Sequence, residues 1–155
     1  MLDLDRFRRA QDASHAGYAV ALRELQAGEK ISHWIWYVFP QLAGLGRSST
    51  AVYYGLAGVE EAIAYLRDRV LGERLATAAA AVQMHLTGSG GRPVPLAKLM
   101  GSEIDALKLV SSMTLFAHVA KTLGLAAMAG HAEAILAAAA AQGYARCAYT
   151  EAQLR

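Results

Sequence analysis

The longest segment of this chain without glycine or proline runs from Ser102 to Leu123. Its large apolar residues recur at the spacing of an α-helix, which is typical of a helix with one side in a protein core. Ser102 can cap the first turn, with Asp105 as an imperfect capping-box partner three residues later. We therefore predict a long helix from Ser102 to about Lys121 and a mainly α-helical fold for the chain.

Helical spacing also divides most of the remaining sequence. Asp3 can cap a first helix, which weakens between Ser14 and Gly17 and ends at Gly28, because a glycine after a helical run commonly stops it. Further helices with the same period are predicted at Val59–Arg69, Leu71–Leu86 and His131–Gln142, with a last turn that starts at Thr150.

Two segments stay ambiguous, and a third predicts a loop. Ser32–Phe39 is crowded with aromatic and branched residues and could be a buried helix or a buried strand; we prefer a short helix that Ser32 caps and Pro40 ends. Ser48–Gly55 gives no clear period. The glycines and prolines of Thr87–Pro95 predict a mobile surface loop, and their spacing does not match a phosphate-binding loop.

The length and composition fit one domain rather than several. The 155 residues include 55% hydrophobic and 18% charged residues, which is enough to bury a core and leaves little charge for the surface. We expect a single compact domain over residues 3–155, with about six to seven helices joined by short irregular connections. Self-association into a homo-oligomer through a remaining apolar patch is consistent with this composition.

The sequence indicates an intracellular protein. No uninterrupted apolar run approaches the roughly 18 residues that a membrane helix needs, and acidic residues occupy positions where a signal peptide would be basic. Cys147 is the only cysteine, which excludes an intrachain disulfide and suits a reducing compartment. We therefore expect a cytoplasmic location and no membrane partner.

The charged residues and histidines argue against two common functions. The net charge of +2 offers no broad field for nucleic acid, and we interpret the one basic cluster, Arg6–Arg9, as a solvated helix face that needs no partner. His85 and His118 lack a second histidine or carboxylate at the three- or four-residue helical spacing of a metal site, and His15 and His131 are no better candidates. We expect neither nucleic-acid binding nor a metal centre, and the sequence identifies no cofactor.

A polar group lies within the apolar side of the predicted 102–121 helix. At about 100° per residue, Asp105, Lys108 and Ser112 fall among large apolar residues. The opposite, solvated stripe contains Glu103, Thr114, Ala117 and Lys121. Charges in apolar surroundings are costly unless they meet each other, further hydrogen bonds or a ligand. Asp105 and Lys108 can pair, and Ser111 and Ser112 lie within reach of Lys108.

This group has a chemical and a structural interpretation. A lysine in apolar surroundings loses its proton more readily, which allows it to act as a base or to activate a hydroxyl. In the structural alternative, Asp105 caps its own helix, Lys108 extends to water along its stem, and the two serines donate to helix carbonyls.

A second group combines aromatic and polar residues between positions 32 and 41. Trp34 and Trp36 could line a pocket and stack on a planar ligand, and His33 could act as an acid or base near neutral pH. Gln41 lies at the end of the same segment. Core packing is the alternative for each aromatic residue and for His33.

Several strings of residues resemble a known family. They include Ser32-His33-Trp34, Phe39-Pro40-Gln41, Asp105 with Lys108, and Ser111-Ser112 with Thr114-Leu115-Phe116. From residue 3 to residue 116 the chain resembles the family catalogued as Domain of Unknown Function 1810, and the alanine-rich helical tail, 117–155, diverges from it. The resemblance implies a compact bacterial-type helical domain without an established activity. It singles out the motif positions His33, Trp34, Gln41, Asp105, Lys108, Ser111, Ser112 and Thr114.

Two functions of different classes remain open. In the first, the 33–41 segment and the 105–116 helix form a site for a small anionic molecule, nucleotide-like or sugar-phosphate, in an enzyme of the hydrolase or transferase kind. Its candidate catalytic residues are Lys108, Asp105 and His33, and its candidate ligand-binding residues are Trp34, Trp36, Gln41, Ser111, Ser112 and Thr114. In the second, the aromatic surface docks a protein partner or a second copy of the chain, and the Asp105–Lys108 pair fixes the register.

Overall fold

The computed structural model describes residues 3–89 and 91–155, and helices make up 68% of these residues. Over these residues no strand forms. Leu42 and Leu56 make an isolated β-bridge. The ten helices are α1 Asp5–Asp12, α2 Tyr18–Ala27, α3 Ile35–Val38, α4 Ser49–Tyr54, α5 Val59–Arg67, α6 Arg69–Thr87, α7 Leu96–Leu99, α8 Glu103–Leu123, α9 Ala126–Ala141 and α10 Ala148–Gln153.

The prediction of a mainly helical single domain is confirmed, but the number of helices is higher than the six to seven expected. Four of the ten, α3, α4, α7 and α10, have only four to six residues. A helical period becomes visible only over a window of about 11 to 18 residues, so helices this short leave no periodic signal.

The weak point predicted between Ser14 and Gly17 is a complete break between α1 and α2. Ala16 has a φ of 53°, and a Cβ on Gly17 would overlap the Ala13 carbonyl oxygen. The turn between the two helices therefore requires a glycine at position 17. The prediction that Asp3 caps α1 is wrong, since Leu4 occupies the cap position and no side chain supplies the hydrogen bond. Gly28 ends α2 in the left-handed conformation, as predicted.

The two ambiguous segments are both partly helical. In Ser32–Phe39 only Ile35–Val38 is helical, and Ser32 does not cap it because its hydroxyl is bound to Glu24. The Ser48 side chain caps α4 by accepting a hydrogen bond from the Ala51 N–H group. Helix α9 begins at Ala126, earlier than predicted, because residues 126–130 are alanine and glycine apart from Met128 and carry little periodic apolar signal.

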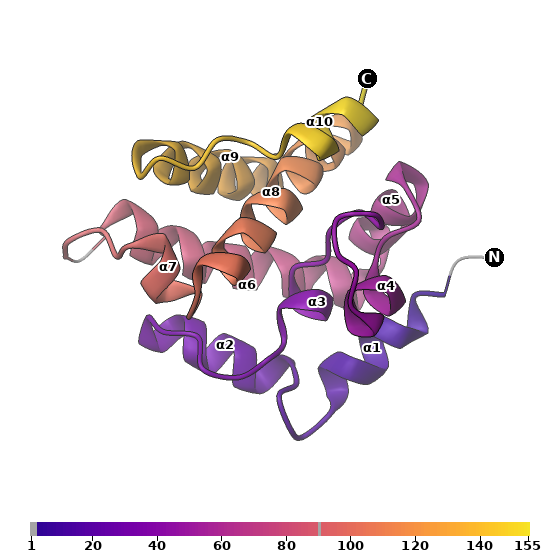
Figure 1. Ribbon diagram of the computed structural model, residues 1–155, viewed down its shortest axis with the longest axis horizontal. Coiled ribbons are helices and arrows are strands. Elements are labelled where there is room, and N and C mark those ends of the chain that lie inside the picture. The colour runs from indigo at the N-terminus through magenta and orange to yellow at the C-terminus, as the bar shows by residue number, and fades with distance from the viewer. Residues whose placement is uncertain (1–2, 90) are drawn as a thin grey trace.

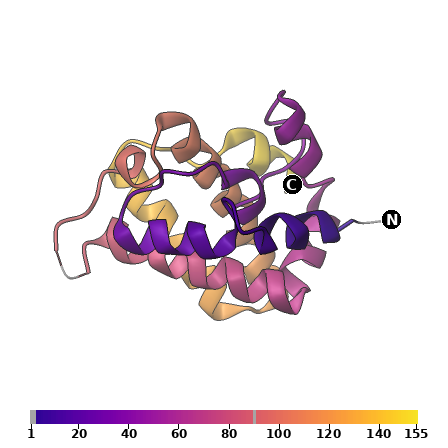
Figure 2. The ribbon, with the colours of Figure 1, turned by 90° about the horizontal axis from the view of Figure 1, so that it is seen from below.

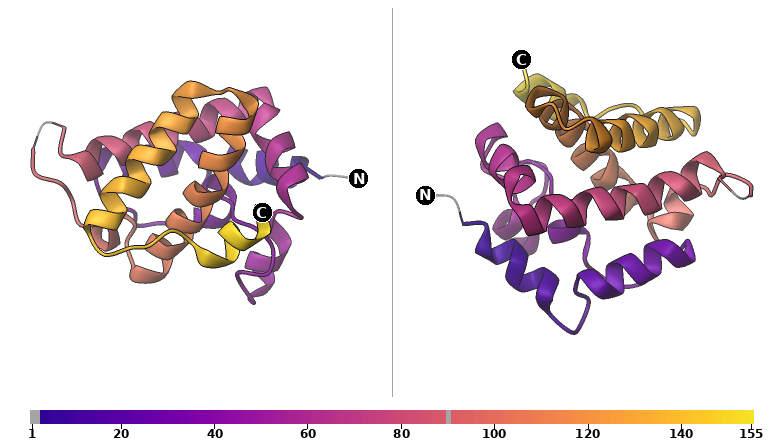
Figure 3. Two further views of the ribbon diagram at one scale, coloured as in Figure 1. Left: turned by 90° about the horizontal axis from the view of Figure 1, so that it is seen from above. Right: turned by 180° about the vertical axis from the view of Figure 1, so that it is seen from behind.

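The helices stack in layers around α8. Figure 3, seen from behind, shows α6 between α9 on one side and α1 with α2 on the other. Seen from below in Figure 2, α1 and α2 lie along α6. Helix α8 crosses the molecule from α7 toward α10 (Figure 1) and packs against α9, α5 and α7. None of the described helices has both the length and the apolar character needed to cross a bilayer.

Helix α8 is enclosed on all sides along its middle. Every residue from Leu109 to Ala117 is buried. This corrects the prediction of a solvated stripe: Glu103 and Lys121 are exposed, but Thr114 and Ala117 each expose only 3% of their surface. The reason is the chain after α9, which packs over this side and donates a hydrogen bond to the Thr114 hydroxyl.

The interpretation of Arg6–Arg9 as a fully solvated face is also wrong. Arg6 is buried, and its guanidinium forms a two-pronged ion pair with Glu61 at 2.9 and 3.1 Å. It also donates to the Tyr53 and Gly55 carbonyls, which ties α1 to the end of α4 and to α5. A single charge in a basic run gives no sequence signal for a partner that lies far along the chain.

Candidate functional site

The segment between α2 and α3, residues 28–34, carries several predicted residues to the start of α8. Its Lys30 N–H group donates to the Leu99 carbonyl at 2.8 Å. Gly101, just before α8, has a φ of 82°, and a Cβ there would lie 2.6 Å from the Lys30 carbonyl oxygen. Glycine permits both this φ and this close approach, so Gly101 determines how the segment meets α8.

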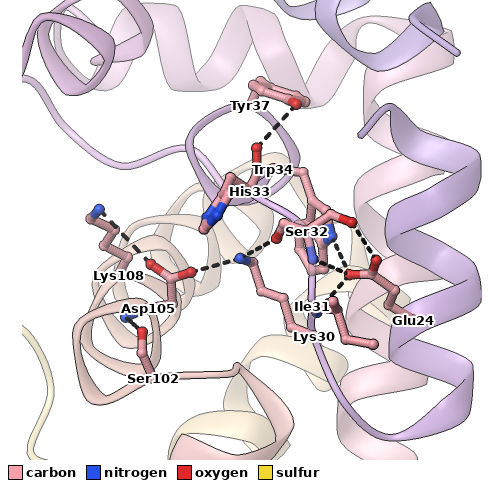
Figure 4. Close-up of polar contacts among 10 residues, drawn as sticks. All are labelled: Glu24, Lys30, Ile31, Ser32, His33, Trp34, Tyr37, Ser102, Asp105 and Lys108. Carbon is pink, nitrogen blue, oxygen red and sulfur yellow. Dashed lines mark hydrogen bonds and ion pairs between the residues drawn. The ribbon is translucent and has the colours of Figure 1, made fainter. Parts of the chain in front are cut away.

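Glu24, near the end of α2, holds the 31–34 segment in place (Figure 4). Its carboxylate accepts hydrogen bonds from the N–H groups of Ile31 (2.8 Å) and Ser32 (2.9 Å), the Ser32 hydroxyl (2.6 Å) and the Trp34 indole (2.9 Å). Burial by itself would raise the pKa of Glu24, but these hydrogen bonds, with those from Ser32 strongest, lower it to about 2. The ionised carboxylate therefore fixes the backbone that presents His33.

Asp105 lies between two lysines (Figure 4). One carboxylate oxygen is 2.7 Å from the Lys30 ammonium, and the other is 3.9 Å from that of Lys108. The predicted Asp105–Lys108 pair is therefore present at the outer limit of an ion pair, while the closer partner, Lys30, was not predicted. The Ser102 hydroxyl caps α8 by accepting from the Asp105 N–H group, so the Asp105 carboxylate is not needed as a cap.

Each of the two lysines also lies over a tryptophan ring. The Lys30 ammonium is 4.9 Å from the Trp34 ring centroid, and that of Lys108 is 5.0 Å from the Trp36 centroid. Lys30 is almost fully buried, whereas Lys108 exposes 21% of its side chain. Within the described part of the chain the Lys108 ammonium makes no hydrogen bond, so it retains donors for a ligand.

A cleft of about 210 Å³ lies at this ion pair, and we call it the Asp105 cleft. It is lined by Lys30, Ile31, His33, Trp36, Met100, Gly101, Ser102, Ile104 and Asp105. Three predicted residues, His33, Trp36 and Asp105, are thus brought together around one concavity, as expected of a ligand site.

Trp36 also lines a second cavity, which we call the Trp36 crevice. With about 10 Å³ it has room for about one water molecule. It is lined by Ile35, Trp36, Phe39, Gln41, Ala51, Tyr54, Gly55 and Lys108. Lys108 and Gln41 therefore both line the crevice, and Trp36 lines both the crevice and the Asp105 cleft.

The other predicted residues line neither cavity. Trp34 is wholly buried and its indole N–H is bound to Glu24, so it supports the segment. Ser111 donates to the Leu107 carbonyl one turn earlier in α8, as the structural alternative predicted, and Thr114 donates to the Val110 carbonyl in the same way. Ser112 is fully buried, and within the described residues its hydroxyl has no partner, so the predicted contact with Lys108 does not form.

Sequence reasoning missed Lys30 and Glu24. Both partners of Lys30, Asp105 and the Trp34 ring, depend on how the loop after Gly28 folds back, which leaves no periodic signal. Glu24 lies on the predicted helix among ordinary polar residues. The sequence offered one clue to an acceptor such as Glu24. The loop after Gly28 contains many hydrogen-bond donors, and buried N–H groups in a loop need acceptors.

Two larger cavities lie elsewhere. One of about 470 Å³, between the start of α6 and the turn from α8 to α9, is mostly apolar. The other, of about 340 Å³, lies between α8, α9 and α10, and its ion pair between Glu133 and Arg146 is exposed to solvent. Among the residues that the structure describes, neither cavity contains a buried ion pair. Among the described residues no group of three or more histidine, cysteine or acidic side chains could hold a metal ion.

Comparisons with known proteins agree with the resemblance seen in the motifs. Residues 1–145 match the model of a family described as protein of unknown function (DUF1810), so the match extends through α9. The crystal structure of the conserved hypothetical protein Rv1873 from Mycobacterium tuberculosis is similar, with a TM-score of 0.79 and 39% identity over 97% of this chain and 94% of that chain. No curated protein matches the chain. The chain therefore belongs to the DUF1810 family, a family of unknown function.

Proposed function

We propose that the Asp105 cleft, together with Lys108 at its edge, binds a small anionic molecule of the nucleotide or sugar-phosphate kind. The observation that carries this proposal is the position of Asp105 between two lysines. The group has one more positive than negative charge, and Lys108 keeps free donors beside a half-buried tryptophan. An excess cation at a concave, partly desolvated place favours an anionic ligand.

The roles follow from what each side chain already contacts. Lys108 binds the anionic group, and Trp36 offers a ring face to a planar part of the ligand. Asp105 forms ion pairs with both Lys30 and Lys108 and orients them, so it serves as a positioning residue. His33 is exposed on the wall of the cleft and is the group free to transfer a proton if the protein is a hydrolase or transferase.

The size of the cleft limits the ligand. Its volume of about 210 Å³ is below the roughly 300 to 1,000 Å³ of sites that enclose a drug-sized molecule. A sugar or phosphate group fits inside, and a larger ligand would extend over the rim, where Ile31 and Ile104 are strongly exposed.

Thermal-shift measurements with a panel of nucleotides and sugar phosphates test this proposal. We expect at least one ligand to raise the melting temperature of the wild type and to have little effect on Lys108→Ala. Lys98→Ala removes an exposed lysine of α7 that lines neither the Asp105 cleft, the Trp36 crevice nor the two larger cavities, and is the matched control. A shift that survives in Lys108→Ala, or no shift with any ligand, would refute the proposal.

A second candidate function is self-association. Ile31, Ile104 and Leu107 expose 75%, 66% and 52% of their surfaces, and the first two line the Asp105 cleft. Adjacent exposed apolar side chains are typical of contact surfaces between proteins. Light scattering on wild type and Ile104→Ser separates the two functions: a dimer that the substitution dissociates, together with no ligand shift, would favour self-association.

A further inference from the structure

The apolar cavity between the start of α6 and the turn from α8 to α9 lies outside the proposed site. We call it the α6–α9 groove; it is lined by residues from 66–76 and by all of 124–128. Its volume of about 470 Å³ is within the roughly 300 to 1,000 Å³ of small-molecule sites. Leu66 and Met128 are buried in its lining, whereas Leu125 exposes 40% of its surface. Covering this surface favours a ligand with an apolar body.

One wall of the groove is the start of α9, where Leu125 occupies the cap position. A leucine lacks the side-chain oxygen that usually accepts from the first N–H groups of a helix. Within the described residues the N–H groups of Ala126, Ala127 and Met128 make no hydrogen bond, and the first turn has no acidic side chain. Helix α6, at the other wall, is capped by Asp68. Only the start of α9 therefore leaves the positive end of a helix dipole uncompensated beside this groove.

The charged side chains of the groove also favour an anion. Arg67, the last residue of α5, is exposed and makes no ion pair within the described residues. The two acidic residues of the groove have partners already, since Asp68 pairs with Arg8 and Glu73 lies 3.9 Å from Arg69. Arg67 therefore remains as a cation without a counter-charge. An unpaired cation beside an apolar surface is complementary to an amphiphile with an anionic head group.

We propose that the α6–α9 groove binds an aliphatic carboxylate of medium chain length. The hydrocarbon chain packs on Leu66, Leu125 and Met128, and the carboxylate accepts from the N–H groups at the start of α9, with Arg67 as its counter-charge. A carboxylate is chosen because it is the group with which aspartate caps helices. Each half of the ligand relieves a cost of the unbound protein, the exposed leucine or the uncapped helix. The site is separate from the Asp105 cleft and does not depend on the proposed function.

Calorimetric titration with octanoate, and separately with octanol, tests the two halves of the ligand. Octanol keeps the hydrocarbon chain but has no charge, and we expect it to bind about tenfold more weakly. In a proton–nitrogen NMR spectrum, octanoate should move the amide signals of Ala126, Ala127 and Met128. The proposal is overturned if octanoate binds no more tightly than octanol, or if it moves only signals from the Asp105 cleft.

An added carboxylate at the same place should compete with the ligand. Ala127→Glu puts an acid in the first turn of α9 and keeps Leu125, so we expect the melting temperature to rise by about 1 to 3 °C while octanoate binds about tenfold more weakly. Ala137→Glu, at an exposed position of α9 outside the groove, is the matched control and should leave the affinity unchanged.

The counter-charge has its own pair of variants. Arg67→Ala should weaken octanoate binding several-fold, whereas Arg23→Ala removes an exposed arginine outside the groove and should not. Octanoate binding that is as tight in Ala127→Glu as in the wild type would refute the site, whatever the stability of that variant. An equal loss in Arg67→Ala and Arg23→Ala would also count against it, because it would indicate an effect of overall charge.

Discussion

Replacing Glu24 with glutamine tests the contact that shapes the candidate site. The Glu24 carboxylate accepts from two backbone N–H groups, the Ser32 hydroxyl and the Trp34 indole. Glutamine has nearly the same shape but no charge, and only one of its two terminal atoms can accept a hydrogen bond. The Glu24→Gln variant should therefore fold, with a weakened connection between α2 and the 31–34 segment.

The magnitude follows from the pKa of Glu24. Folding lowers it from 4.5 to about 2, a difference of about 2.5. At about 1.4 kcal/mol for each pKa unit this corresponds to at most about 3.5 kcal/mol. The carboxylate is partly exposed, and solvent screening reduces the value. We expect the free energy of unfolding to fall by about 2 kcal/mol near neutral pH.

The pH dependence has a definite sign. Because the folded-state pKa lies below the unfolded-state value, the stabilisation is complete above about pH 4.5 and is lost as the pH falls through about 2. The difference between wild type and Glu24→Gln should stay constant from neutral pH down to about pH 5. It should then shrink as wild-type Glu24 becomes protonated and uncharged like the variant.

Urea unfolding followed by circular dichroism measures this difference at each pH. Glu29→Gln, at an exposed position just after the same helix, is the matched control and should change stability by less than about 0.5 kcal/mol. A difference for Glu24→Gln that is no larger than that of the control, or that does not decline in acid, would contradict the account of Glu24 as a charged acceptor.

Three other substitutions probe the contacts that assemble the fold. Glu61→Gln leaves the Arg6 guanidinium buried without its counter-charge, and urea unfolding should show a loss of about 3 kcal/mol; a loss under about 1 kcal/mol would mean that water reaches the pair. Gly101→Ala should lower the melting temperature, because its φ and the nearby Lys30 carbonyl oppose a side chain, whereas Gly130→Ala, within α9 and with open space around it, should raise stability by about 0.5 to 1 kcal/mol. Thr114→Val removes the acceptor of the Cys147 N–H group, and hydrogen exchange at the Cys147 amide should become faster while the amides of α8 stay protected.

The helices with a clear period could be predicted from the sequence because their signals are local. The Ser102 cap of α8, the Gly28 end of α2 and the helices α5 and α6 all depend on residues within a few turns. Of the short helices, α4 and α7 were not predicted, since four to six residues carry no period and tertiary contacts stabilise them. The short helix α3 and the last turn, α10, were predicted from the residues that flank them and not from a period.

The candidate site was predictable in part for the same reason. The pairing of Asp105 with Lys108 follows from their spacing on one helix, and the grouping of His33 with Trp36 follows from their closeness in sequence. The sequence did not predict which of the two tryptophans, Trp34 or Trp36, lines a cavity. That depends on the tertiary contacts of the short, irregular segment that contains them. The hydrogen bonds from the 31–34 segment to Glu24 bury Trp34 and leave Trp36 at the cleft.

The sequence by itself determined the helical class, the single core and the presence of charges on an apolar helix side, since periodicity and composition are properties of the chain alone. Only the tertiary structure decided that Lys30 pairs with Asp105, that the end of the chain covers Thr114 and that the Lys108 ammonium makes no hydrogen bond to the described residues. Those outcomes depend on which distant segments meet, and the free energy of a buried charge depends on the groups that packing places around it.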